Sequence, residues 1–148
     1  MEKRKLGKTE LEVSRLGFGG AEIGFDNEKQ GTVDTLLNSA IDSGLNLIDT
    51  AAAYWTSEKM IGEAISSRRN NLVLISKCGA LDGFSKEDWS KQGILETIQN
   101  SLRLLKTDYL DIAQLHSCSS EILKRGEVIE ALIVAKEKGY TRYAGYSG

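Results

Sequence analysis

The stretch that decides the fold of this chain spans residues 45–54 and reads Leu45-Asn46-Leu47-Ile48-Asp49-Thr50-Ala51-Ala52-Ala53-Tyr54. Its first four residues predict a short buried strand, which ends in a carboxylate and is followed by an alanine-rich turn that carries a phenol. Taken alone, Asp49 is typical of a residue that ends a strand or caps a turn. Two later apolar strands also end in an ionisable residue, Lys77 and His116, so three predicted strands carry a polar group at the same end.

The order of the predicted elements indicates an α/β fold with a parallel sheet. Strands are expected to begin near five residues, the first four each being followed by a helix: Arg15, Leu45, Leu72, Tyr109 and Thr141. Runs such as residues 72–75 are continuously apolar, as in parallel strands that are covered on both faces. Parallel βα units form either an open sheet or a barrel, and a barrel places its catalytic groups at the carboxyl ends of several strands. We therefore predict a parallel (β/α) barrel of the TIM type, truncated after the fifth strand.

The whole chain, residues 1–148, is expected to form one partial barrel domain. A short β-hairpin over residues 3–14 precedes the βα units of residues 15–148. Helices are expected over Thr32–Ser43 with Leu36 facing inward, from an N-cap at Ser57, from an N-cap at Ser90 to Leu105, and over Glu121–Lys138. The segment Cys78–Trp89 between them is expected to be a polar loop at the level of Lys77.

Composition narrows the classes of partner. The 19 basic and 21 acidic residues form no block of like charge, so nothing favours nucleic acid or a membrane as a partner. No apolar run is long enough for a secretory signal or a membrane span, and a cytoplasmic location is expected. The two cysteines form no C-x-x-C pair, so we expect reduced thiols and no metal site.

Six motifs together make the chain resemble the N-terminal part of an aldo-keto reductase. They are Leu45-Asn46-Leu47-Ile48-Asp49-Thr50-Ala51-x-x-Tyr54, Ser57-Glu58-x-x-Ile61-Gly62, Ser76-Lys77, Ser101-Leu102-x-x-Leu105-x-Thr107-Asp108-Tyr109-Leu110-Asp111, Gln114-x-His116 and Arg142-Tyr143-x-Gly145-x-Ser147. They occur in the family's order and span nearly the whole chain. The resemblance implies a (β/α)8 barrel that transfers a hydride between a nicotinamide cofactor and a small carbonyl substrate.

The resemblance also implies a role for each matching residue. Tyr54 would be the general acid that protonates the carbonyl oxygen. Lys77, anchored by Asp49, would favour the phenolate through its positive charge, and His116 would orient the carbonyl group. These four residues are the predicted catalytic set, and we expect them to converge on one pocket.

The resemblance implies NADP as the cofactor, with NAD as the alternative. The positions expected to contact it are Gly20, Ala21, Asp49 and Ser147, although Gly20-Ala21 would equally suit a plain glycine turn and Ser147 the cap of a strand end. Two residues depart from the family pattern. Trp55 stands where the family usually has glycine, which suggests a wall of the substrate site, and Gly148 replaces an asparagine that commonly follows the serine.

Three further βα units of the family's barrel, which hold most of its cofactor site, have no counterpart in these 148 residues. The alternative interpretation is therefore a truncated, catalytically incompetent fragment that acts as an interaction or assembly module. We expect that the 148-residue chain either pairs its open strand edges with a second copy, in a symmetric or swapped homodimer, or is a piece of a longer chain. Inward side chains such as Phe18, Ile48 and Ile75 are expected to lack an opposite wall.

Two other enzyme classes fit these residues less well. No tyrosine has lysine four residues later, as a short-chain dehydrogenase would require. A barrel lyase that uses Lys77 as a Schiff-base nucleophile is disfavoured by the company of Asp49 and Tyr54.

Overall fold

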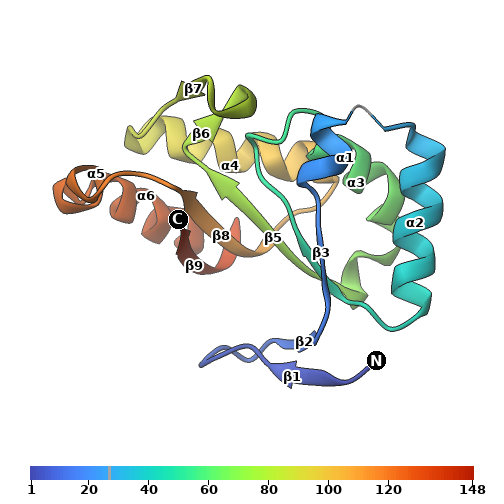
Figure 1. Ribbon diagram of the computed structural model, residues 1–148. Helices are drawn as coiled ribbons and strands as arrows, with labels where there is room; N and C mark the ends of the chain where they lie inside the picture. Colours follow the sequence, from blue (N-terminus) through green and yellow to red (C-terminus); the bar gives the residue numbers. More distant parts are fainter. Residues whose placement is uncertain (27) are drawn as a thin grey trace.

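The computed structural model describes residues 1–26 and 28–148, and the centre of this part of the chain is a sheet of five parallel strands (Figure 1). The strands lie side by side in sequence order: β3 (Gly17–Gly19), β4 (Leu47–Asp49), β5 (Val73–Cys78), β8 (Leu110–His116) and β9 (Thr141–Ser147). Parallel neighbours need a long crossover between them, and each crossover here contains a helix. The predicted parallel α/β sheet is confirmed.

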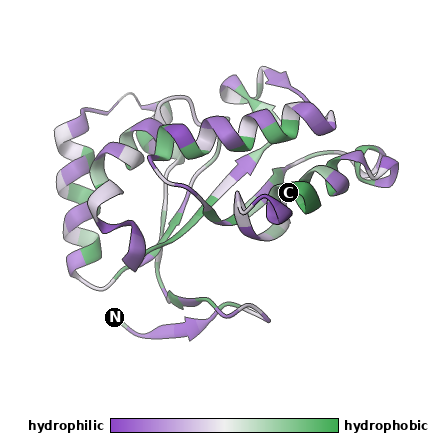
Figure 2. Cartoon of the chain, turned by 180° about the vertical axis from the view of Figure 1, so that it is seen from behind, coloured by the Kyte–Doolittle hydropathy of each residue, from purple (hydrophilic) through white to green (hydrophobic). Residues whose placement is uncertain are grey.

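The longer helices form a layer in which each packs on the next along the chain: α2 (Gln30–Asp42), α3 (Ser57–Ile65), α4 (Lys91–Leu105) and α6 (Glu127–Glu137). The main core lies between this layer and the sheet, and its fully buried side chains include Leu37, Ile48, Ile61, Leu74, Ile98 and Leu115. Figure 2 shows hydrophobic residues along the central strands and on one side of the helices. This is the pattern of amphipathic helices that cover one face of a sheet.

The predicted N-terminal hairpin is present and lies beneath the amino ends of the strands (Figure 1). It pairs β1 (Lys3–Lys5) with β2 (Glu12–Ser14) in antiparallel register. Apolar side chains of the hairpin pack on the face of the sheet opposite the helices, in a second cluster made of Leu11, Val13, Val73, Ile75 and Ile112. The hairpin therefore covers part of the inner wall of the half-barrel.

The expectation that Phe18, Ile48 and Ile75 all point inward was wrong for two of them. Ile75 belongs to the inner cluster, but Ile48 and Phe18 pack in the main core on the helix side. Successive side chains of a strand point to opposite faces. Leu47 packs with the inner cluster, so its neighbour Ile48 must face the helices.

Several predicted element boundaries also differ from the structure. The helix predicted over Glu121–Lys138 is two helices, α5 (Ser120–Arg125) and α6, because Gly126 between them has φ of +80°. The predicted loop Cys78–Trp89 contains a small hairpin of β6 (Ala80–Leu81) and β7 (Lys86–Glu87) around the turn Asp82–Phe84.

Near the amino end, the structure adds the short helix α1 (Ala21–Phe25), which the sequence did not suggest. Leu36 was expected to face inward but is 47% exposed. A 3₁₀ turn, Ser66–Asn71, connects α3 to β5.

Two helix caps were predicted, and one is confirmed. Ser90 precedes α4 and accepts a hydrogen bond from the backbone N–H of Gly93 at 3.0 Å. Ser57 is not a cap: it is the first residue of α3, and its hydroxyl instead donates to the carbonyl oxygen of Gly20 at 2.7 Å.

Candidate functional site

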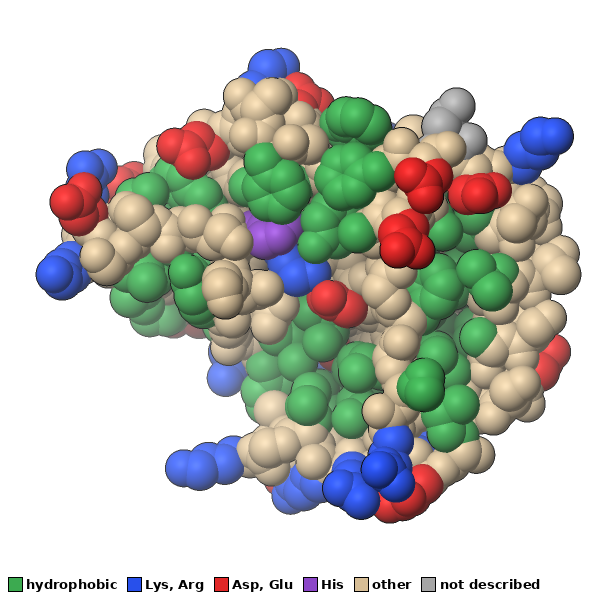
Figure 3. All heavy atoms as spheres, in the orientation of Figure 1, with side chains coloured by type: hydrophobic (Ala, Val, Ile, Leu, Met, Phe, Trp, Pro, Cys, Tyr) green, Lys and Arg blue, Asp and Glu red, His purple; other side chains and the backbone are tan. Residues whose placement is uncertain are grey.

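The polar residues at the predicted strand ends lie at the carboxyl edge of the sheet. Asp49, His116 and Ser147 are the last residues of β4, β8 and β9, and Lys77 is one residue from the end of β5. These positions agree with the expectation that the strands end in polar residues. Figure 3 shows the chain's single histidine between hydrophobic side chains above and a basic and an acidic side chain below.

Lys77 and Asp49 form the centre of this cluster. The Nζ atom of Lys77 lies 2.9 Å from each Asp49 carboxylate oxygen and 2.9 Å from the carbonyl oxygen of Thr50. An ammonium group has three hydrogens to donate, and here three acceptors surround it. An amine held in this way as an ion pair has no free lone pair, so the geometry gives no support to a Schiff-base role for Lys77.

Tyr54 lies on the loop after β4, where its half-buried ring faces this ion pair. The Nζ atom of Lys77 lies 5.1 Å from the centre of the Tyr54 ring, and the ring centres of His116 and Tyr54 lie 5.5 Å apart. The structure thus brings the four predicted catalytic side chains together, with Asp49 linked to Tyr54 through Lys77.

His116 is only 6% exposed, and its Nδ1 atom has no hydrogen-bond partner among residues 1–26 and 28–148. Burial lowers the pKa of His116 to about 4, and the nearby ammonium of Lys77 acts in the same direction, whereas Asp49 opposes both. The imidazole is therefore neutral near pH 7. A neutral imidazole can hold a carbonyl group by a hydrogen bond without adding charge to the site.

The residues predicted to contact a cofactor flank this cluster on both sides. Ser147 is paired in register with His116 on the neighbouring strand, while Gly20 follows β3 next to Asp49. The N–H of Gly20 donates to the Asp49 carbonyl oxygen at 2.8 Å, and its own carbonyl oxygen accepts from Ser57. A Cβ atom at position 20 would lie 2.7 Å from the Ser57 hydroxyl, so this close approach requires glycine. Ala21 begins α1 beside it.

The donor and acceptor groups left at this edge fit the polar end of a nicotinamide nucleoside. The Asp49 side chain is 43% exposed although it also holds Lys77, so it can still accept a hydrogen bond from a ribose hydroxyl. The hydroxyl of half-buried Ser147 can donate to, or accept from, a carboxamide.

Glu58 and the two cysteines are buried ionisable groups that do not belong to the cluster. Burial raises the pKa of Glu58, whose carboxylate accepts a 2.6 Å hydrogen bond from Ser76. Burial likewise raises the pKa of the Cys78 thiol to about 12, which makes it a poor nucleophile. Cys118 is also buried and free.

In the part of the chain that the structure describes, no group of His, Cys, Asp or Glu side chains could hold a metal ion. Over the same residues, no helix combines the length and apolar character needed to cross a membrane.

Sequence reasoning missed the aromatic residues around Tyr54 and His116. Phe84, on the turn of the β6–β7 hairpin, lies 4.7 Å from the His116 ring, and Phe25 of α1 lies 5.6 Å from the Tyr54 ring. An aromatic residue after a glycine in an otherwise polar loop was a signal that could have identified Phe84.

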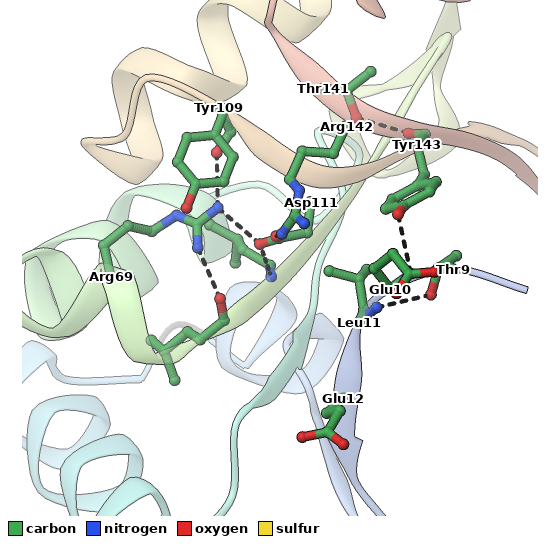
Figure 4. Close-up of polar contacts among 12 residues, drawn as sticks. Thr9, Glu10, Leu11, Glu12, Arg69, Tyr109, Asp111, Thr141, Arg142 and Tyr143 are labelled. Atoms are coloured by element: carbon green, nitrogen blue, oxygen red, sulfur yellow. Dashed lines mark hydrogen bonds and ion pairs between the residues drawn. The ribbon is translucent and has the colours of Figure 1, made fainter. Parts of the chain in front are cut away.

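A second polar network at the amino ends of the strands was also missed (Figure 4). Asp111 is 1% exposed, and its carboxylate lies 2.8 Å from Arg69 and 2.9 Å from Arg142. Tyr143 nearby ties the hairpin to β9, because its hydroxyl accepts from the backbone N–H of Glu10 at 3.0 Å. A polar cavity of about 570 Å³ borders this network and is lined in part by Asp111 and Arg142.

Comparison with known proteins gives one consistent result. The family model described as "Aldo/keto reductase family" matches residues 15–148. The chain is 38% identical over 153 residues to the uncharacterized oxidoreductase YqkF of Bacillus subtilis, a match that covers 99% of this chain and 49% of the relative. It is 32% identical over 168 residues to an NADH-specific methylglyoxal reductase of Escherichia coli, covering 98% and 51% of the two chains.

Among solved structures, the chain is similar to the aldo-keto reductase AKR11C1 of Bacillus halodurans in its holo form. The TM-score is 0.89 at 35% sequence identity, and the match covers 99% of this chain and 50% of that one. The chain thus spans about half the length of the curated relatives that it matches.

Proposed function

We propose, because this chain belongs to the aldo/keto reductase family, that it carries the catalytic half of an NAD(P)H-dependent oxidoreductase that reduces aldehydes and ketones to alcohols. The observation that supports this most directly is the contact of Lys77 with both Asp49 and the Tyr54 ring, beside a neutral His116. NADP is the proposed cofactor and NAD the alternative, since one relative is named as NADH-specific.

Each side chain has a task in this proposal. The Tyr54 hydroxyl gives its proton to the carbonyl oxygen as negative charge develops there. The Lys77 ammonium stabilises the phenolate that remains, and Asp49 holds that ammonium at 2.9 Å. His116 orients the carbonyl group by a hydrogen bond, which a neutral imidazole can make.

A bound NAD(P)H would supply the hydride that reaches the carbonyl carbon and would itself be oxidised. Asp49 and Ser147 are the proposed contacts for its ribose and carboxamide. Gly20 and Ala21 would let the cofactor lie close against the backbone. They would act by shape, because the N–H and the carbonyl oxygen of Gly20 are already hydrogen-bonded within the protein.

The test combines turnover with cofactor binding. Consumption of NADPH or NADH with a simple aldehyde is followed by absorbance, and cofactor binding by tryptophan fluorescence, with Trp55 close to the site. Tyr54→Phe is expected to lower kcat by about 10²–10⁴-fold, because a general acid acts mainly in the transition state, and to leave cofactor affinity nearly unchanged. Tyr140→Phe, which also removes one phenol hydroxyl, is the matched control, because among residues 1–26 and 28–148 that hydroxyl bonds only to the exposed Gln99.

Wild-type turnover in the Tyr54→Phe variant would remove the catalytic assignment. The second candidate is an interaction module, which the exposed apolar side chains Ile129 and Ile133 of α6 favour. Wild-type protein that neither binds NAD(P)H nor reduces any carbonyl compound would favour this module over the enzyme.

A further inference from the structure

The first turn of α3 carries two buried polar side chains that the proposed reaction does not use. Ser57 is fully buried and Glu58 is 2% exposed, and they are the first two residues of the helix. A buried polar group is costly unless it is hydrogen-bonded, so the partners of these side chains show what the helix holds in place. Glu58 accepts from Ser76, the residue before Lys77. Ser57 reaches the residues that follow β3 and β4.

The Ser57 hydroxyl joins those two segments directly. It donates to the carbonyl oxygen of Gly20 at 2.7 Å, and the hydroxyl oxygen of Thr50 lies 2.8 Å from it. A hydroxyl has one hydrogen to donate, so the Ser57 hydroxyl, which donates to Gly20, accepts from Thr50. Thr50 is also fully buried, so both hydroxyls are shielded from water.

These bonds close a ring around the end of β4. The N–H of Gly20 donates to the carbonyl oxygen of Asp49 at 2.8 Å, and Thr50 comes next in the chain. The ring therefore runs from Gly20 to Asp49, along the backbone to Thr50, and back through the Ser57 hydroxyl to Gly20. Asp49 and Thr50 are also the residues that hold the Lys77 ammonium, by the Asp49 carboxylate and the Thr50 carbonyl oxygen.

The packing around the Ser57 hydroxyl is tight. A Cβ atom at position 20 would lie 2.7 Å from this hydroxyl and 3.2 Å from that of Thr50, so both pack against the bare backbone of Gly20. Removal of the Ser57 oxygen would leave the Gly20 carbonyl oxygen and the Thr50 hydroxyl without this partner. Unpaired buried polar groups are costly, so the segment that carries Thr50 would shift to pair them.

We propose that Ser57 is a positioning residue of the candidate site, whose hydroxyl fixes the Thr50 carbonyl oxygen where it accepts a hydrogen of the Lys77 ammonium. The proposal rests on the proposed function in one respect, which is that the Lys77 ammonium acts on Tyr54. Its structural part, the position of that ammonium, can be measured without any reaction.

Loss of the ring should move the Lys77 ammonium toward solvent. If the Thr50 carbonyl oxygen shifts, the ammonium keeps the Asp49 carboxylate, whose side chain is 43% exposed, as its partner. The ion pair then lies further from the buried His116 ring. The charge that Lys77 offers to the site would be weaker, although no residue that touches the substrate has changed.

The pKa of His116 gives a readout that needs neither cofactor nor turnover. Burial lowers that pKa most and the Lys77 ammonium lowers it further, so a more distant ammonium should let it rise. NMR titration of the chain's single imidazole is expected to give a higher pKa in Ser57→Ala and in Thr50→Val, because each variant breaks the ring at one hydroxyl. Ser14→Ala is the matched control and should leave the pKa unchanged. It removes another buried serine hydroxyl that bonds to backbone groups, at the amino end of the sheet.

Turnover gives the second readout. The kcat for reduction of a simple aldehyde is expected to fall about 3- to 10-fold in Ser57→Ala, the size of one lost hydrogen bond, while the KM for the aldehyde stays within about 2-fold. The double variant Ser57→Ala/Thr50→Val should lose no more than the single variant with the larger loss, because either change opens the same ring.

An unchanged His116 pKa and an unchanged kcat in both single variants would overturn the proposal, and so would an equal rise of that pKa in Ser14→Ala. Should Ser57→Ala fail to fold, Thr50→Val decides alone, because valine keeps the branched shape of threonine. A wild-type chain that reduces no carbonyl compound would remove the proposed function. The His116 pKa in the variants would still decide whether Ser57 positions the ammonium.

Discussion

The protonation of His116 gives the sharpest prediction from this structure. Its pKa is lowered to about 4 from an ordinary value of 6.5, mainly by burial and then by the Lys77 ammonium. The folded chain therefore takes up this proton only near pH 4, whereas the unfolded chain takes it up near pH 6.5. The unfolded state binds more protons in that interval, so the group's contribution to stability is present above pH 6.5 and is lost as the pH falls toward 4.

The size of the effect follows from the two pKa values. One unit of pKa difference corresponds to about 1.4 kcal/mol. Between about pH 8 and about pH 5, His116 alone should lower the free energy of unfolding by about 2 kcal/mol, rising to about 3 kcal/mol at lower pH. Glu58, whose pKa is raised by burial, changes stability in the opposite sense, so the total pH dependence does not isolate His116.

Two measurements isolate it. The imidazole resonance of the single histidine, followed by NMR against pH, gives the pKa in the folded chain directly. Urea unfolding of the wild type and of His116→Asn across the same pH range gives the linked stability, and the difference between the two pH slopes is the quantity predicted. Lys77→Met should raise the His116 pKa only part of the way to 6.5, since burial remains. A measured His116 pKa of about 6 or above, or equal slopes in wild type and His116→Asn, would refute the reasoning.

Three further predictions concern the rest of the molecule. Asp111→Ala should destabilise the chain by about 3–5 kcal/mol in urea unfolding, because it leaves Arg69 and Arg142 without their buried carboxylate; a loss below about 1 kcal/mol would contradict this. Because burial raises the pKa of Glu58 above its ordinary 4.5, its contribution to stability is fully present below pH 4.5 and is lost as the pH rises through the raised pKa. The difference in stability between Glu58→Gln and wild type should therefore shift in favour of Glu58→Gln from about pH 5 to about pH 8. The same difference at both pH values would argue against this. The open edge of β9 and the exposed Ile133 should drive self-association, so sedimentation velocity should show a concentration-dependent dimer, and a monomer at all concentrations would exclude it.

Local patterns along the chain were enough to predict the order of the five parallel strands and of the longer helices between them. The continuously apolar run 72–75 overlaps the first half of the central strand β5, and Gly44 and Gly139 lie just past the ends of α2 and α6 with positive φ, as helix-ending glycines do. Ser90 capped α4 as expected. These features depend on a few neighbouring residues, which is why the sequence alone could indicate them.

The same local information placed the polar strand ends at one edge of the sheet. Parallel strands of similar length bring their carboxyl ends together, so Asp49, Lys77 and His116 had to be neighbours once the sheet was parallel. The catalytic roles given to them come from the family resemblance and stay predictions.

Contacts between segments distant in sequence could only be found in the tertiary structure. Ser57 was predicted as a cap, but it turns to the carbonyl oxygen of Gly20, 37 residues away, because the start of α3 packs against the end of β3. Ile48 faces the helices and not the barrel interior, since the side on which a strand's alternation begins is set by register with its neighbours. Phe84 meets His116 only because the β6–β7 hairpin folds back over the strand ends. The sequence by itself thus determined the parallel strands, the longer helices and the edge where the polar strand ends gather. Long-range packing decided which side chains meet there, because such contacts have no periodic signature along the chain.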